Sequence, residues 1–122
     1  MKVLNNNEVE ERIIYLCKEF DKLKYEDIFA YNVQDKLYYT DYVLLITANS
    51  NTQLESSLGI LKNFEKKYRV KNKIIGHKNI ESGWIIYDYS SFVIHVFTEE
   101  KRNFYKFDEL FDEYEKVGFL DD

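Results

Sequence analysis

Apolar residues recur every three or four positions near the start of the chain, which is the spacing of one face of a helix. They predict an amphipathic helix whose buried stripe consists of Val9, Ile13, Leu16, Cys17, Phe20 and Leu23. Asn7 stands three residues before Glu10, the spacing of a helix capping pair, so we expect the helix to begin there.

Two apolar segments that are too short for helices come next, and they predict strands over residues 28–33 and 42–48. The second segment, YVLLITA, is apolar at both alternating sets of positions. A strand of this kind is buried on both faces, so we expect it in the interior of a sheet.

A second helix is predicted after these strands. Ser50 and Gln53 form a Ser-x-x-Gln capping box, and the periodic pattern continues to about Tyr68. The apolar stripe of this helix consists of Leu54, Leu58, Leu61 and Tyr68. A short strand near residues 74–75 would complete a strand–helix–strand crossover.

The segment GWIIYDYSSFVIHVF predicts a β-hairpin with Ser90 and Ser91 as its two-residue loop. In that register Trp84 lies opposite Phe97. One face then carries Trp84, Ile86, Asp88, Val93, His95 and Phe97. The other carries Ile85, Tyr87, Tyr89, Phe92, Ile94 and Val96. Both faces are largely apolar, so we expect one to pack under helices and the other to meet a partner or a second copy of the chain.

Thr98, followed by two glutamates, predicts the cap of a third helix. Its aromatic stripe at helical spacing consists of Phe104, Phe107, Phe111 and Tyr114. These elements together predict an α/β (α+β) fold in which helices cover a mixed sheet of about five strands. With 122 residues, 45% of them hydrophobic, the chain is expected to form a single domain over 1–122.

Charge narrows the class of partner. The 17 basic and 22 acidic side chains give a net charge of −5, which argues against dominant direct nucleic-acid binding and favours a basic protein partner. Residues 62–78 nevertheless hold seven basic and one acidic side chain, and residues 99–122 hold four basic and nine acidic ones. We interpret the basic stretch as a solvated helix end and loop.

The composition of the chain argues against several classes of function. The longest apolar run, residues 43–46, is far too short to cross a membrane. The single cysteine, Cys17, cannot form an internal disulfide, which fits a cytoplasmic location. Two histidines and one cysteine supply no structural zinc site, and the four glycines form no phosphate-binding loop, so we expect no metal and no cofactor.

Asp88 and His95 are the one pair to weigh as catalytic, because the hairpin places them diagonally on one face. No activated serine or exposed cysteine accompanies them, so we interpret His95 as a structural strand histidine. No Asp-x-Asp or Asp-x-Glu occurs in the chain to hold a metal pair. We therefore expect the protein not to be an enzyme.

Trp84 and Arg102 are candidates for contacts outside the core. A lone Trp in a small domain usually lies in the core, but Trp84 shares its strand face with polar Asp88 and His95, which adds a partly exposed anchor as a second interpretation. Arg102 lies in the first turn of the third helix, where a cation opposes the helix dipole, so we expect it to have a carboxylate partner. That partner is either Asp88 or a residue of another protein.

From Asp27 to Tyr114 the chain resembles the ribosomal silencing factor family, also called the iojap-like family. The resemblance rests on ordered blocks: DIFAYNV, then DYVLLITANSNTQ, then GWIIYDYSSFVIHVFTEEKRNFYKFDELF. The last block carries the family's Trp, Asp-Tyr, Val-x-His-x-Phe, Arg-x-x-Tyr and closing Leu-aromatic. In place of the family's Gly-Asp hairpin turn, this chain has Ser90 and Ser91.

The resemblance implies a translation regulator that binds protein number fourteen of the large ribosomal subunit. Occupying that site keeps the two subunits apart and represses translation under nutrient limitation. The implied fold has nucleotidyltransferase-like topology without the catalytic acids. The implied partner-binding residues include Trp84, Asp88 and Tyr89. Four further motif positions are either contacts or scaffold: His95, Phe97, Arg102 and Tyr105.

Two other hypotheses stay open. One is a divergent nucleotidyltransferase-like protein that binds a nucleotide. The other is a homodimer that uses the same sheet face, because members of the family can self-associate near the partner site. Dimer formation by the free protein would then compete with ribosome binding.

Overall fold

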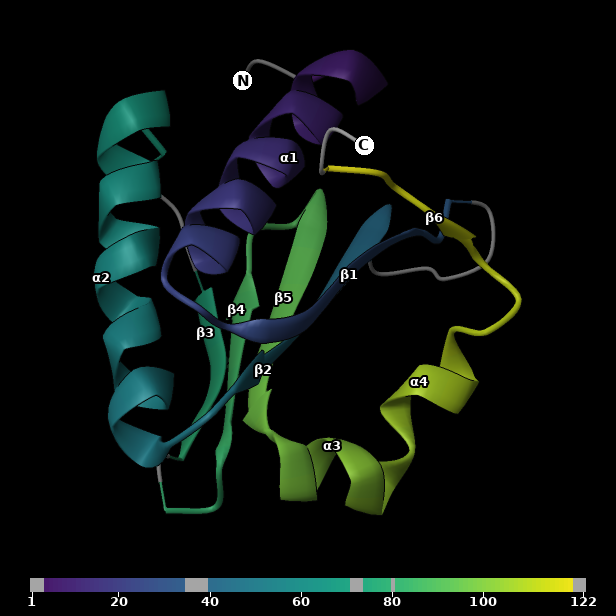
Figure 1. Ribbon diagram of the computed structural model, residues 1–122. Helices are drawn as coiled ribbons and strands as arrows, with labels where there is room; N and C mark the ends of the chain where they lie inside the picture. Colours follow the sequence, from purple (N-terminus) through teal and green to yellow (C-terminus); the bar gives the residue numbers. More distant parts are fainter. Residues whose placement is uncertain (1–3, 35–39, 71–73, 80, 120–122) are drawn as a thin grey trace.

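The computed structural model describes residues 4–34, 40–70, 74–79 and 81–119, with side chains omitted for 74–79. Within these ranges the elements follow in the order α1 (Asn6–Lys22), β1 (Glu26–Asn32), β2 (Tyr42–Ala48), α2 (Asn51–Tyr68), β3 (Ile74–Asn79), β4 (Trp84–Asp88), β5 (Phe92–Thr98), α3 (Glu99–Tyr105), α4 (Phe107–Leu110) and β6 (Glu115–Lys116). The long helices α1 and α2 cover one face of the sheet, whereas the short helices α3 and α4 lie on its other side (Figure 1).

The sheet has the strand order β3-β4-β5-β2-β1-β6. The central strands β2 and β5 are parallel, and the other neighbouring strands are antiparallel. This confirms the predicted mixed sheet with helices; the two-residue strand β6 was not expected. The nucleotidyltransferase-like topology stays a prediction.

Strand β2 is the interior strand that its sequence predicts. Every residue of Tyr42–Ala48 is buried, because α1 and α2 cover one of its faces and the aromatic rings that follow β5 cover part of the other. The crossover from β2 through α2 to β3 also forms, but β5 and β4 lie between its two strands.

The first helix begins two residues before the predicted point. The side chain of Asn5 accepts a hydrogen bond from the Glu8 amide at 2.9 Å, so Asn5 is the N-cap and the proposed Asn7–Glu10 pair is wrong. Leu23 is 57% exposed and does not belong to the buried stripe. The chain turns away from the helix at Lys24, which has a φ of 68°.

The second helix is capped as predicted. Ser50 Oγ accepts from the Gln53 amide at 3.0 Å, and Gln53 Oε1 in turn accepts from the amide of Asn49 at 2.6 Å. The helix ends at Tyr68, and Arg69 takes the left-handed C-cap conformation. Its buried face consists of Leu54, Ser57, Ile60, Leu61 and Phe64, so Leu58 and Tyr68 lie at its margin.

The hairpin β4–β5 has the predicted register, with Trp84 opposite Phe97 and Asp88 opposite Val93. Ser90 adopts a φ of 72°, which is unfavourable for a residue with a side chain. Asp88 Oδ1 accepts from the Ser90 amide at 2.7 Å and stabilises this turn. The turn therefore forms without the glycine that such loops prefer.

The third predicted helix is broken. It ends at Tyr105, Lys106 has a φ of 52°, and the separate one-turn helix α4 follows. The break allows Arg102 to pair with Asp108, since residues six apart point to different sides of a continuous helix. It also leaves Phe104 in solvent while Phe107 is buried.

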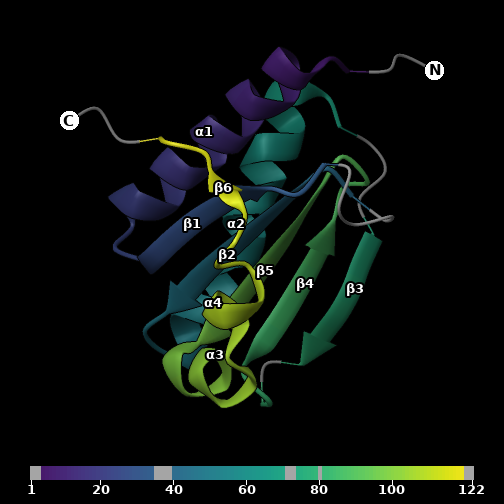
Figure 2. The same cartoon turned by 90° about the vertical axis from the view of Figure 1, so that its right-hand side faces the viewer.

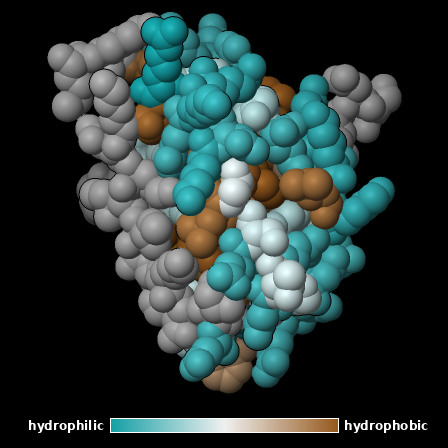
Figure 3. Space-filling model, turned by 90° about the vertical axis from the view of Figure 1, so that its left-hand side faces the viewer, coloured by the Kyte–Doolittle hydropathy of each residue, from teal (hydrophilic) through white to brown (hydrophobic). Residues whose placement is uncertain are grey.

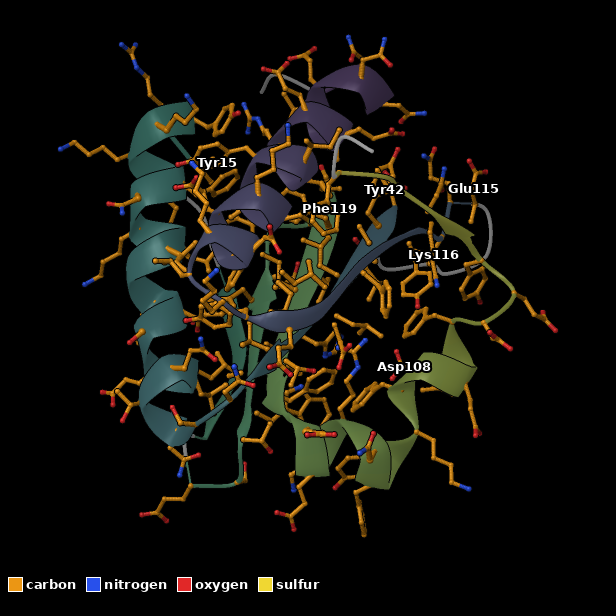
Figure 4. All side chains as sticks on the ribbon, viewed as in Figure 1. Tyr15, Tyr42, Asp108, Glu115, Lys116 and Phe119 are labelled. Carbon is orange, nitrogen blue, oxygen red and sulfur yellow. The ribbon has the colours of Figure 1, made fainter. Side chains whose placement is uncertain are left out.

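Two hydrophobic clusters lie on opposite sides of the sheet. The larger one joins α1 and α2 to the sheet, and Tyr15 bridges the two helices through its ring contacts with Phe64 and Tyr68 (Figure 4). The smaller cluster consists of Tyr31, Val33, Val43, Leu45, Phe97, Phe107 and Phe111. No helix within the described ranges is long and apolar enough to span a membrane.

Candidate protein-docking site

The two faces of the hairpin β4–β5 have different surroundings. The face that carries Ile85, Tyr87, Tyr89, Phe92, Ile94 and Val96 is buried under α1 and α2. On the other face, Trp84, Ile86, Asp88 and His95 are only half-buried. Figure 2 looks onto this second side, where α3 and α4 lie over the other end of the sheet and leave β4 and β3 uncovered. We call these four residues, together with Tyr105, the open face.

Trp84 lies at the centre of an aromatic group on the open face. Its ring centre is 5.1 Å from that of Phe107, 5.6 Å from that of Tyr105 and 5.9 Å from that of His95. The indole Nε1 donates a hydrogen bond to His95 Nδ1 at 3.2 Å. The ring is thereby held rigidly while part of it stays accessible, which is the usual condition of an aromatic binding anchor.

His95 is a neutral side chain that supports Trp84. Because its Nδ1 accepts the indole hydrogen bond, its own proton is on Nε2. Burial lowers the pKa of His95 to about 4, since a charged imidazole would lose its hydration. Asp88 uses its carboxylate on the Ser90 amide, and among the described residues no hydrogen bond joins it to His95. The structural interpretation of His95 therefore holds, and the catalytic pair does not form.

Arg102 is the centre of a buried clamp under the open face. It is 3% exposed, and its Nε and Nη2 donate to the two carboxylate oxygens of Asp108 at 2.9 and 2.7 Å. Its Nη1 donates to the carbonyl oxygen of Asp27 at 2.6 Å and to Thr47 Oγ1 at 3.0 Å. Its guanidinium carbon lies 5.5 Å from the ring centre of Phe29. The expected carboxylate partner is thus Asp108 rather than Asp88.

The clamp fixes α3 and α4 against the sheet. Asp108 projects from α4 toward the strands (Figure 4), and the Arg102 hydrogen bonds lower the pKa of its carboxyl group. The same arrangement ties α3 to β1 and β2 through Asp27 and Thr47. Tyr105 is consequently held beside Trp84, with 47% of its surface exposed.

Tyr89 lies on the helix-covered side, away from Trp84 and Asp88. Its hydroxyl donates to Glu65 Oε2 of α2 at 2.6 Å, and burial raises the pKa of the phenol. Tyr89 therefore joins the hairpin to α2.

The structure brings together Trp84, His95, Phe97 and Tyr105, with Asp88 farther along the same face. Phe97 is fully buried, so it supports the surface from below, as Arg102 does. Two large apolar side chains that the sequence did not single out as contacts are also exposed: Phe104 at 73% and Leu110 at 64%. Their exposure could not be predicted from a continuous helix, because it depends on the break at Lys106.

The segment that carries Tyr105 is rich in acidic side chains. Between residues 99 and 116 the chain has seven acidic and four basic side chains, and one of the basic ones is the buried Arg102. Within the described residues no group of three or more His, Cys, Asp or Glu side chains is placed to hold a metal ion. The aromatic centre and the acidic segment that follows β5 suit protein recognition.

Comparisons with known proteins agree with this architecture. Residues 6–122 match the family model described as "Ribosomal silencing factor during starvation". The ribosomal silencing factor RsfS of Bacillus subtilis is 26% identical over 90 residues, which are 74% of this chain and 75% of that protein. The chloroplastic protein Iojap of Zea mays is 25% identical over 99 residues, which are 80% of this chain but only 42% of the relative.

Solved structures show the same fold. A Chromobacterium violaceum protein aligns with a TM-score of 0.73 at 20% identity, covering 98% of this chain and 95% of the other. A Bacillus halodurans protein aligns with a TM-score of 0.68 at 23% identity, covering 93% and 99%. The chain spans about two fifths of the plant relatives, 42% of the maize and 40% of the Arabidopsis thaliana Iojap protein. Because the family model matches nearly its whole length, the chain belongs to the ribosomal silencing factor family.

Proposed function

We propose that this protein binds protein number fourteen of the large ribosomal subunit through its open face and blocks association of the two subunits. Translation is then repressed under nutrient limitation, and the protein acts in the cytoplasm as a steric regulator rather than an enzyme. Membership of the ribosomal silencing factor family supports a role on the ribosome. The observation that carries the choice of surface is the half-buried Trp84, hydrogen-bonded to His95 on the sheet face opposite α1 and α2, which α3 and α4 cover only in part.

Charge supports a protein as the direct partner. A chain of net charge −5, with seven acidic side chains between residues 99 and 116, is suited to a basic protein surface. Of the seven residues that the family motifs assign to partner binding, Trp84, Asp88, His95 and Tyr105 are accessible enough to touch a partner. Phe97, Arg102 and Tyr89 are buried and act as supports.

Binding of Trp84→Ala to purified large subunits tests this proposal by co-sedimentation. Removing a central aromatic anchor is expected to cost about 2 kcal/mol or more, which is about thirtyfold in affinity. Tyr68→Ala is the matched control, since Tyr68 is also partly buried but lies on the helix-covered side. Equal binding by wild type and Trp84→Ala would exclude the open face, and no binding by wild type would exclude the function.

The free protein is proposed to form a homodimer through the same surface. Tyr105 of the open face is exposed, as are Phe104 of α3 and Leu110 of α4, and self-association would bury these apolar side chains. Light scattering with and without the ribosomal protein measures the oligomeric state and tests this. A dimer that persists in the complex would contradict the idea that self-association and ribosome binding compete for one surface.

Nucleotide binding is the alternative function, which a rise in melting temperature with nucleoside triphosphate and Mg²⁺ would favour.

A further inference from the structure

Helix α2 carries a row of exposed cations on its outer side. Lys62 and Lys66 lie one turn apart on one face of the helix, and Arg69 follows at the C-cap. All three side chains are exposed, and no other element that the structure describes covers this side of α2 (Figure 1). We call Lys62, Lys66 and Arg69 the basic ridge.

The charges around the basic ridge do not cancel it. Residues 62–69 hold four basic side chains and one acidic side chain, Glu65. Glu65 Oε2 accepts a hydrogen bond from the Tyr89 hydroxyl at 2.6 Å, so this carboxylate is turned toward the sheet. From α1, Glu11 and Arg12 act on the last residue of α2 with opposite signs. The end of the helix adds only about half a negative charge, so the ridge keeps a net positive charge.

No ion pair holds the ridge side chains in place. Within the part of the chain that the structure describes, Lys62, Lys66 and Arg69 form no salt bridge with a carboxylate. Lys67 differs, because its ammonium group lies 5.2 Å from the centre of the Tyr15 ring. The helix dipole favours cations in the last turn, which accounts for Lys66 but not for Lys62, more than one turn before the end. The ridge is therefore available to an external anion.

Family membership narrows the kind of anion that fits the ridge. It implies association with the ribosome, whose surface consists of RNA and basic proteins. A basic protein would repel the ridge, whereas the phosphates of RNA attract it. An anionic membrane would also attract lysines, but the apolar face of α2 is buried against the sheet and cannot insert among lipids. We propose that the basic ridge binds phosphate groups of RNA, which on the ribosome are those of ribosomal RNA.

The basic ridge and the open face lie on opposite sides of the sheet, because α2 covers the side that the open face does not (Figures 1 and 2). RNA on the ridge therefore leaves the open face free for a protein. Since the whole chain has a net charge of −5, this contact supplements protein docking and is weak and salt-dependent. The choice of ribosomal RNA rests on the proposed function; the affinity of the ridge for RNA phosphates does not.

The test is fluorescence anisotropy of a short fluorescein-labelled RNA duplex, titrated with the full chain at several KCl concentrations. Wild type should bind saturably, with an affinity that falls as the salt concentration rises. Lys62→Gln/Lys66→Gln removes two phosphate contacts. Binding by this variant should weaken about tenfold, and the slope of the logarithm of affinity against the logarithm of salt concentration should shrink by about 2.

Lys24→Gln/Lys106→Gln is the matched control, because it removes the same charge from exposed positions outside the ridge. Its affinity and salt slope should stay near those of wild type. Equal weakening in both variants would mean a general charge effect and would overturn the proposal, as would the absence of saturable binding by wild type. A polyglutamate peptide that binds as tightly as the RNA would indicate an acidic protein instead and would also overturn it.

Binding to ribosomal components separates this proposal from the proposed function. Lys62→Gln/Lys66→Gln should bind isolated ribosomal protein number fourteen as wild type does, but should bind large subunits about tenfold more weakly. Equal large-subunit binding by wild type and this variant would overturn the contact with ribosomal RNA. If RNA binds the ridge but wild type does not bind subunits, the proposed function fails while the RNA-binding ridge stands.

Discussion

The two faces of one hairpin differ in what their side chains do. On the helix-covered face, Tyr87 and Tyr89 are buried, and their hydroxyls are hydrogen-bonded to residues of α2. On the open face, Trp84 and His95 are hydrogen-bonded to each other and half-buried. Seen from the α2 side, the outer surface of this region is mainly hydrophilic, with some apolar residues in its middle (Figure 3). The covered face thus holds the fold together, and the open face is rigid yet accessible.

The largest expected effect comes from Arg102→Ala, which removes the clamp below the open face. The half-exposed carboxylate of Asp108, the Asp27 carbonyl and the buried Thr47 hydroxyl lose their partner, so the free energy of unfolding should fall by about 3–4 kcal/mol. Urea unfolding measures this. Lys101→Ala, at the next position, should change stability by less than about 0.5 kcal/mol. Equal losses in both variants would contradict the clamp.

A smaller effect should appear in the pH dependence of stability through His95. Its pKa falls from 6.5 in the unfolded chain to about 4 in the folded protein, so the unfolded state binds more protons between these values. Stability should therefore fall as pH drops from about 6.5 to 4, by up to about 3 kcal/mol, and the loss from this group should stop below that.

The difference between wild type and His95→Gln isolates this effect, because the carboxyl groups titrate in both proteins. Urea unfolding at several pH values measures it. A difference that stays constant from pH 7 to 4 would mean that His95 is hydrated and that the centre of the open face is not rigidly packed.

The smallest effect distinguishes two tyrosines on opposite faces. Tyr87→Phe removes a buried hydroxyl that lies 2.6 Å from Ser57 Oγ, so it should destabilise the fold by about 1–2 kcal/mol. Tyr105→Phe on the open face should change thermal stability by less than about 0.5 kcal/mol. The comparison fails if the two variants lose equal stability.

Local rules in the sequence predict much of this fold. Strand alternation gives the register of β4–β5, and the Ser50 cap gives the start of α2. The same alternation assigns Tyr89 to the face opposite Trp84. Because both are residues of the family motifs, the motif residues do not all lie on one surface, and the sequence alone predicts this. The break at Lys106 is different, because it depends on Arg102 reaching Asp27 and Thr47, which are distant in sequence.

The candidate site was predictable only in part, because it too depends on contacts between residues that are distant in sequence. Trp84 is identifiable because polar residues share its strand face. The exposure of Phe104 and the burial of Phe107 follow from tertiary contacts, since both lie on one stripe of the expected continuous helix. The choice between the two apolar hairpin faces likewise depends on which one α1 and α2 cover.

The most direct test of the open face is a subunit-association assay by sucrose-gradient sedimentation. Purified small and large subunits are mixed with wild type, Trp84→Ala or Tyr68→Ala before Mg²⁺ is raised to promote association. Wild type and Tyr68→Ala should leave the subunits separate, and Trp84→Ala should allow them to join. Full association in the presence of wild type, or equal inhibition by wild type and Trp84→Ala, would contradict the account.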